Sequence, residues 1–278
     1  MMSEYYFERT NRMFISNRRI DNGYSHPLHF HDGCEIYLLN KGDATFNFEN
    51  FSFKMSHGSM VVIPPYVPHS SVCDSSVVYD RMVISMKPEY VKKLCTPNTD
   101  LTECFKRQSD CSKYAIVLDD EQLSEIMRLQ HKLDGIKKDD MFGSDVLHDA
   151  YAAEFLVLVN RAMKYNSFTG DNAMPEIVHK ILSWMIKNRK EIFSMENLAN
   201  DLHMSGSYLS RKFKEYMGIP IRQYIVQKKV EEACYLLRMG ENVTNACYSA
   251  GFNDYANFIR TFKNVIGMTP GEYAKKSI

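Results

Sequence analysis

The sequence predicts an α+β protein of two domains: an N-terminal β-barrel or jelly roll with a helical pair, and an all-α C-terminal domain. Short apolar segments between Gly, Asn, Asp or Pro recur through residues 34–86, which is typical of antiparallel strands. From residue 119 onward, apolar residues recur at helical spacing. The chain of 278 residues is long enough for two ordinary domains. The predicted domains are residues 1–165 and 175–278, joined by a linker at 166–174.

The expected strands of the first domain lie close together in the sequence. They cover residues 34–39, 44–48, 51–55, 59–63 and 77–84. Residues 44–53 alternate aromatic and polar side chains around a predicted hairpin tip at Glu49 and Asn50. Such regular spacing favours a small barrel or jelly roll. Residues 1–20 are expected to form an arm or an edge strand, and residues 87–118 show no readable chemistry.

Helical spacing then continues to the C-terminus. Residues 119–134 and 144–165 are each expected to form a helix with an apolar stripe. The polar segment NSFTGDNA at 166–173 predicts the linker, and Pro175 begins the next helix. Further helices are expected at residues 176–188, 194–202, 205–218, 221–239, 242–250 and 253–267. The only tryptophan, Trp184, is interpreted as a core residue rather than a site residue.

One helical pattern occurs twice in the C-terminal domain. Residues 205–218 read SGSYLSRKFKEYMG, and residues 251–270 read GFNDYANFIRTFKNVIGMTP. The aligned residues are Ser210 with Ile259, Arg211 with Arg260, Phe213 with Phe262, Lys214 with Lys263, Gly218 with Gly267, and Tyr208 with Tyr255 or its neighbours. Because another short helix precedes each copy, the pattern predicts a tandem helix-turn-helix.

Residues 196–273 resemble the DNA-binding domain of the AraC/XylS transcription regulators. The resemblance is carried by Leu198, Ala199, His203, Met204, Ser205, Tyr208, Leu209, Ser210, Arg211, Phe213, Lys214, Gly218, Ala233, Leu236, Leu237, Val243, Gly251, Phe252, Phe258, Arg260, Phe262, Lys263, Gly267, Thr269 and Pro270. Four residues depart from the usual pattern: Lys229, Ala246, Cys247 and Ala274. The resemblance implies that the two helices lie in successive major grooves of promoter DNA.

The resemblance also implies roles for particular residues. Bases would be faced by Ser207, Ser210 and Arg211 in the first half, and by Tyr255, Ala256, Ile259 and Arg260 in the second. The two arginines could pair with guanine, whereas Lys214 and Lys263 are expected to meet phosphates. For the whole chain, the family implies a transcription regulator rather than an enzyme, and an activator rather than a repressor. Its partners would be a sugar or related effector, RNA polymerase and a second copy bound through the helical pair.

A second resemblance lies within the predicted barrel. The first cupin motif is matched by Gly23, His29, His31, Glu35 and Gly42, and the second by Gly58, Pro64 and His69, with Tyr66 in place of Gly and Cys73 in place of Asn. His29 and His31 are expected to alternate on one strand face, so that both can point inward. The cluster His29, His31, Glu35 and His69 is then expected to bind Zn, Mn, Fe or Ni, to line the effector pocket, or to be structural.

The cupin resemblance leaves a second function open. A metal-dependent enzyme, such as an oxygenase or a sugar isomerase, could carry the C-terminal domain as an appendage. Tyr66 and Cys73 weaken this alternative. The sequence shows no Walker loop, dinucleotide fingerprint, GxSxG motif or zinc-finger spacing.

Charge and cysteine content support a DNA-binding protein of the cytoplasm. The net charge is zero, but residues 171–278 carry 15 Lys and Arg against 11 Asp and Glu, and residues 1–170 carry 19 against 23. A basic C-terminal part is expected where only that domain meets phosphate. Seven cysteines without a CxxC pair, and no apolar run of signal-peptide or membrane-spanning length, predict reduced thiols in a cytoplasmic protein.

Overall fold

A computed structural model of the protein describes residues 13–20, 24–48, 51–73, 78–108, 110–136, 141–167, 174–188 and 193–276. The chain forms two compact units. One comprises Met1–His26 and Phe30–Met174, and the other comprises Pro27–His29 and Pro175–Ile278. The expected hairpin tip at Glu49 and Asn50, residue 77 of an expected strand, and residues 168–173 of the expected linker lie outside the described residues.

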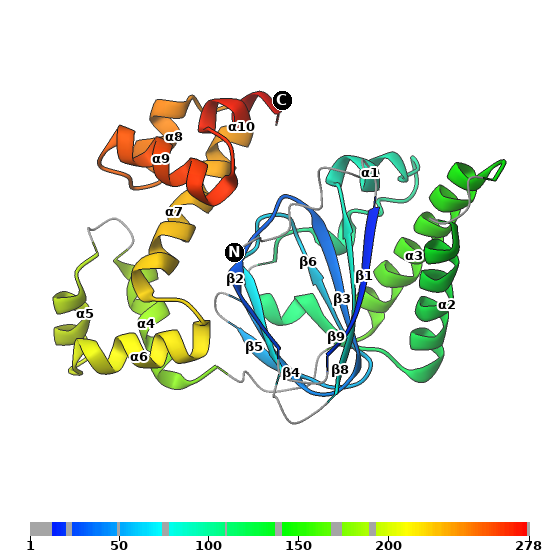
Figure 1. Cartoon of the computed structure of the whole chain (residues 1–278), viewed down its shortest axis with the longest axis horizontal. Helices are drawn as coiled ribbons and strands as arrows, with labels where there is room; N and C mark the ends of the chain where they lie inside the picture. Colours follow the sequence, from blue (N-terminus) through cyan, green and yellow to red (C-terminus); the bar gives the residue numbers. More distant parts are fainter. Residues whose placement is uncertain are drawn as a thin grey trace. The chain divides into compact units, whose positions relative to one another are not determined.

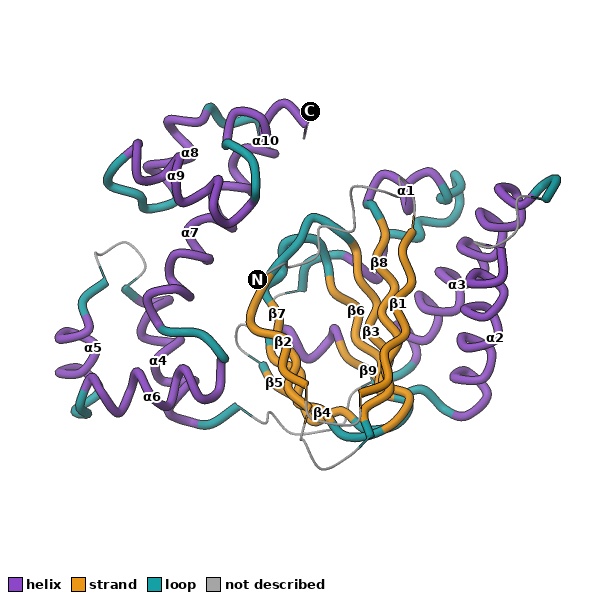
Figure 2. The backbone as a smooth tube through the Cα atoms, viewed as in Figure 1, coloured by secondary structure: helices purple, strands orange, loops and turns teal. Residues whose placement is uncertain are grey.

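Two β-sheets form the N-terminal unit (Figures 1 and 2). Within the described residues the strands are β1 (Met13–Ile20), β2 (Tyr24–His29), β3 (Cys34–Lys41), β4 (Ala44–Asn47), β5 (Ser52–Met55), β6 (Ser59–Ile63), β7 (His69–Cys73), β8 (Tyr79–Met86) and β9 (Ala115–Val117). One sheet has the order β1-β8-β3-β6-β9, and the other has the order β2-β7-β4-β5. The neighbours β1–β8, β8–β3, β3–β6 and β6–β9 pair antiparallel, as do β7–β4 and β4–β5.

The five-stranded sheet is apolar on both faces. Along β3, Ile36 and Leu38 pack into the core shared with the helices, whereas Tyr37 and Leu39 pack into the core between the two sheets. This alternation follows from the two-residue period of a strand. It also directs Glu35, two residues before Tyr37, into the space between the sheets. The expected barrel-like domain is confirmed, and β1 is an edge strand.

Helices cover the outer face of the five-stranded sheet. The helical elements of this unit are α1 (Pro88–Lys93), η2 (Glu103–Phe105), η3 (Cys111–Tyr114), α2 (Asp120–Ile136) and α3 (Ser144–Tyr165). The long helices α2 and α3 lie side by side (Figure 1). Leu129 of α2 and Phe155 of α3 are fully buried in the core that Ile36 and Leu38 also join. The expected helical pair is therefore part of the core of this unit.

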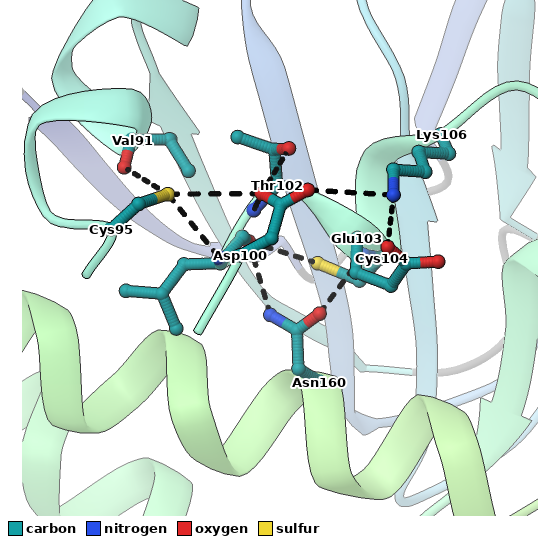
Figure 3. A network of polar contacts seen from close by, with 9 residues as sticks. Val91, Cys95, Asp100, Thr102, Glu103, Cys104, Lys106 and Asn160 are labelled. Carbon is teal, nitrogen blue, oxygen red and sulfur yellow. Dashed lines mark hydrogen bonds and ion pairs between the residues drawn. The ribbon is translucent and has the colours of Figure 1, made fainter. Parts of the chain in front are cut away.

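A polar network fixes the segment between α1 and α3 (Figure 3). The Asn160 side chain accepts a hydrogen bond from the Cys104 backbone N–H at 2.9 Å and donates to the Leu101 carbonyl at 3.1 Å. Asp100 accepts from the Thr102 backbone N–H at 2.9 Å. The Cys95 thiol donates to the Val91 carbonyl at 3.5 Å. These contacts give the cysteines of this segment structural roles.

The C-terminal unit contains helices. They are α4 (Glu176–Lys187), α5 (Met195–Asp201), α6 (Gly206–Met217), α7 (Ile221–Arg238), α8 (Val243–Ser249), α9 (Tyr255–Ile266) and α10 (Pro270–Lys276). The α5–α6 and α8–α9 pairs are the two expected helix-turn-helix motifs, joined by α7. Trp184 is half-buried, and its indole N–H donates to Asp201 at 2.7 Å.

Candidate DNA-binding surface and effector site

Both recognition helices begin and end in the same way. The side chains of Ser205 and Asp254 cap α6 and α9 by accepting backbone N–H groups of Tyr208 and Asn257, respectively. At the other end, Gly218 and Gly267 adopt left-handed conformations with φ of 75° and 86°. Glycine takes this conformation at little steric cost. The two helices are therefore equivalent from cap to cap, and each has 12 residues.

Aromatic residues fix the back of each helix. Phe213 of α6 is fully buried and packs edge-to-face on Tyr224 of α7. In α9, Phe258 and Phe262 are fully buried and contact each other at 5.6 Å between ring centroids. Truncating a buried Phe typically costs about 3–5 kcal/mol. These contacts determine which face of each helix remains outside.

The outer faces carry most of the predicted DNA-binding residues. The exposed ones are Ser207, Arg211 and Lys214 on α6, and Tyr255, Ala256, Arg260 and Lys263 on α9. Ser210 and Ile259 are half-buried, and the Ser210 hydroxyl lies 4.0 Å from the Met195 sulfur of α5. Arginine and lysine thus occupy matching positions on the two exposed faces.

The alignment of Tyr208 with Tyr255 is wrong. Counting from the two caps, Tyr208 is equivalent to Asn257, and Tyr255 is equivalent to Gly206. Aromatic similarity suggested the other alignment, but the caps determine the register. Tyr208 and Asn257 are both exposed, and sequence reasoning missed both as candidates for contact with DNA.

The turns before the recognition helices differ in their left-handed residue. In the first motif it is His203, with φ of 53°, and in the second it is Gly251, with φ of 83°. The Lys229 ammonium group donates to the Gly251 carbonyl at 2.5 Å and lies 5.7 Å from the Phe252 ring centroid. Burial lowers the pKa of Lys229. Lys229, one of the departures from the family pattern, therefore joins α7 to the turn before α9.

The predicted polar cluster forms between the two sheets of the N-terminal unit. The Glu35 carboxylate lies 2.9 Å from His31 Nε2 and 3.8 Å from His69 Nε2. Both imidazoles place Nδ1 against a backbone carbonyl: His31 at 3.1 Å from Gly33, and His69 at 2.8 Å from Val67. Because a carboxylate only accepts hydrogen bonds, a protonated His31 can donate from Nδ1 to the Gly33 carbonyl and from Nε2 to Glu35.

Charge around Glu35 outweighs its burial. Burial alone would raise the pKa of this carboxyl group, but His31, His69 and Arg81 lower it to about 2. Burial also tends to lower the pKa of His31, and Glu35 reverses this and raises it. For His69, burial prevails over Glu35 and lowers the pKa to about 4. At neutral pH the cluster thus contains an ionised carboxylate and a neutral His69.

Other side chains surround this cluster. The Ser85 hydroxyl donates to Glu35 at 3.4 Å, in agreement with the pairing of these two residues across β3 and β8. Phe46 stacks on the His69 ring at 5.8 Å between centroids. The Arg81 guanidinium lies 5.3 Å from the Tyr37 ring centroid. Sequence reasoning missed Ser85 and Arg81, since β8 reads as an ordinary buried strand.

His31, His69 and Glu35 bring two imidazoles and a carboxylate together. His29, the fourth residue of the predicted cluster, belongs to the other compact unit. Imidazoles that place Nδ1 against a carbonyl and direct Nε2 inward are typical of metal-binding histidines. The residues therefore fit a divalent transition-metal ion. The prediction that both histidines of the His-x-His motif lie on one strand is wrong, because β2 ends at His29.

Tyr66, which departs from the cupin pattern, has a strained backbone conformation. Tyr66 has φ of 63° at a position where cupins usually have Gly. Its backbone N–H donates to the His31 carbonyl at 2.8 Å, and its carbonyl accepts from Arg107 at 3.0 Å. A left-handed non-glycine residue persists only where its surroundings hold it. These two hydrogen bonds hold Tyr66 beside His31.

Comparison with protein families agrees with both halves of the structure. Residues 15–156 match the AraC-like ligand binding domain, and residues 198–276 match a helix-turn-helix domain. The chain belongs to the AraC family. It is therefore a transcription regulator that combines a ligand-binding N-terminal domain with a DNA-binding helix-turn-helix domain. The sequence-based prediction of the family, the fold and this function is confirmed.

The similarity to other proteins covers most of the chain. An uncharacterized HTH-type transcriptional regulator, YdeC of Bacillus subtilis, is 23% identical and covers 91% of this chain and 87% of its own. The HTH-type transcriptional activator RhaS of an Enterobacter species is 20% identical, with coverage of 88% and 86%. Among solved structures, unsaturated fatty acid-bound ToxT of Vibrio cholerae is 18% identical, covers 95% of both chains and has a TM-score of 0.40.

Two further observations concern the helices and the cysteines. Within the described ranges, no helix combines the length and the apolar character needed to cross a membrane. All seven cysteines are free thiols.

Proposed function

We propose that this regulator binds promoter DNA through α6 and α9 under the control of a small effector held by His31, Glu35 and His69. The observation that carries the proposal is the position of the Glu35 carboxylate between the imidazoles of His31 and His69, because a single site then offers both acceptors and donors. Sugar hydroxyl groups use both, and the aromatic rings of Phe46 and Tyr37 supply apolar surface beside them. A sugar or related metabolite is therefore the proposed effector.

A thermal-shift screen tests this effector site. Full-length protein is heated with a panel of neutral sugars and sugar acids. A true ligand at 100 times its dissociation constant stabilises the protein by about 2.7 kcal/mol. The shift is expected to disappear in Glu35→Gln and to persist in Glu121→Gln, which makes the same change at an exposed position of α2. An equal shift in both variants would contradict the site.

The same cluster supports a second proposal, that His31, His69 and Glu35 hold a divalent metal ion. Two nitrogen donors and one carboxylate suit Zn, Mn, Fe or Ni. A bound ion would supply a Lewis-acidic centre, while the protein's residues fix its position.

We further propose that the protein is not an enzyme, in line with its relatives, which are named as regulators.

Metal content tests this second proposal. Protein purified without chelator should retain about one equivalent of metal after dialysis, by elemental analysis. Its affinity for a sugar found by the screen should fall on chelation. His31→Ala should remove the metal, and the exposed His57→Ala should keep it. A metal-free preparation that binds the sugar with full affinity would exclude the metal.

The remaining proposals concern regulation and assembly. Activation is supported by relatives named as activators, RhaS and RhaR, and would require contact with RNA polymerase. A homodimer is supported by apolar side chains exposed where α3 begins: Met141, Phe142, Val146 and Leu147. A regulator of promoter DNA with free thiols is also proposed to act in the cytoplasm.

A further inference from the structure

Equivalent positions of the two recognition helices carry different side chains beside equivalent arginines. Counted from the caps, Tyr208 and Asn257 are the third residues of α6 and α9, and Arg211 and Arg260 are the sixth. Residues three apart on a helix face the same side. All four are exposed. The two copies can therefore be compared position by position.

In both copies the third residue contacts the arginine. The Arg211 guanidinium lies 5.8 Å from the Tyr208 ring centroid. In α9, Arg260 donates to the Asn257 side-chain oxygen at 3.4 Å, and the Thr261 hydroxyl lies 3.5 Å from the same oxygen. An arginine side chain has about 2 kcal/mol of rotamer entropy to lose. Contacts made before binding reduce this cost.

Tyr208 and Asn257 differ in the chemical groups that they can present to a DNA base. A tyrosine ring presents apolar surface, which suits the methyl group of thymine. Asn257 directs its oxygen toward Arg260 and Thr261, so its NH₂ group is the part suited to a base acceptor, such as purine N7 or thymine O4. Because N-terminal residues of recognition helices contact base edges, the third position of each helix is well placed for this contact.

We propose that Tyr208 and Asn257 determine specificity, each holding its arginine in place and selecting the base pair beside the guanine that the arginine reads. The proposal rests on the reading of DNA by α6 and α9. It predicts two unequal half-sites. Beside the guanine, the half-site under α6 would prefer thymine, and the half-site under α9 would prefer a base with an acceptor in the major groove.

The test exchanges the two residues in the full-length protein. A preferred duplex is selected from a random library, and every base pair is then varied singly. Tyr208→Asn should change the preference at one position under α6 by about 5- to 150-fold, which corresponds to the cost of one mismatched base pair, and leave the other half-site unchanged. Asn257→Tyr should change the preference at one position under α9 and leave the half-site under α6 unchanged. Asn264→Tyr, the same change at an exposed site near the end of α9, should change no preference.

Conservative variants separate the two roles of each residue. Tyr208→Phe keeps the ring beside Arg211 and should preserve the preference. Asn257→Asp keeps an oxygen for Arg260 but loses the NH₂ donor, so guanine should still be preferred while the neighbouring preference is lost. These variants also provide the test if an exchange variant does not fold, as judged by circular dichroism.

The outcomes distinguish this proposal from the one on which it rests. If Arg211→Ala and Arg260→Ala alter base preference, but all variants at positions 208 and 257 weaken every duplex equally or have no effect, the specificity proposal is wrong. If the arginine variants also bind all duplexes as the wild type does, reading of bases by α6 and α9 is itself wrong.

Discussion

His203 and Gly251 occupy equivalent left-handed turn positions, but only one of them is glycine. A non-glycine residue in this conformation costs roughly 1–2 kcal/mol. The cost at His203 is tolerated because the turn is defined by its neighbours: the Met204 backbone N–H donates to the Ala199 carbonyl at 3.0 Å. The two turns therefore offer a matched pair of substitutions with opposite signs.

His203→Gly should stabilise the C-terminal unit by about 1 kcal/mol, since it relieves the left-handed strain. Gly251→Ala should destabilise it by a similar amount for the same reason. Trp184 fluorescence during urea unfolding reports on this unit, because the only tryptophan lies in α4. Destabilisation by His203→Gly would show that the turn strain is not the dominant contribution.

At the scale of elements, the pair α2 and α3 combines a buried face with an exposed apolar end. Leu129 and Phe155 are fully buried, whereas Val146 is 67% exposed and Phe142 is fully exposed. Apolar groups gathered on a surface in this way often mark a protein interface. A second copy of the chain is the proposed partner.

Sedimentation of the full-length protein tests this interface. The wild type should be dimeric at micromolar concentration, and Phe142→Asp with Val146→Asp should make it monomeric, because the charges would be buried without partners. Met239→Asp, at an equally exposed site in the other unit, should remain dimeric. A wild-type protein that is a single monomeric species, with and without a sugar effector, would contradict the proposal.

The sequence predicted elements best where periodicity and caps agree. The expected helix at 205–218 corresponds to α6 because Ser205 caps it and Gly218 ends it. Strand β7 was missed, since it begins with His69 and two serines that look exposed but are buried. Pattern alone does not separate a polar residue facing solvent from one facing a polar core.

The candidate sites show the same limit. The spacing of His31, Glu35 and His69 predicted their convergence, because it matched a known motif. Ser85 could not be predicted, since its contact with Glu35 depends on the register between β3 and β8. Asn257 was missed because Tyr208 was matched with the aromatic Tyr255 or its neighbours, although the alignment of Arg211 with Arg260 already places Tyr208 opposite Asn257.

At the scale of the whole molecule, two equivalent helices of one chain are proposed to read bases while their lysines position the DNA. Arg211 and Arg260 are the sixth residues from their caps, and Lys214 and Lys263 follow three residues later. Arginine can pair with guanine at two points, whereas a phosphate contact carries no sequence information. Alanine substitution of the arginines and of the lysines is therefore expected to affect DNA binding differently.

Base reading by α6 and α9 is tested by titrating the full-length protein and four alanine variants against two duplexes. One duplex is a selected operator and the other is scrambled, and each titration is repeated at several salt concentrations. Arg211→Ala and Arg260→Ala should each cost about 1–3 kcal/mol on the operator, at the base pair beneath that helix. Lys214→Ala and Lys263→Ala should weaken both duplexes and reduce the salt slope by about one. Operator affinity equal to that of the wild type in both arginine variants would contradict base reading by α6 and α9.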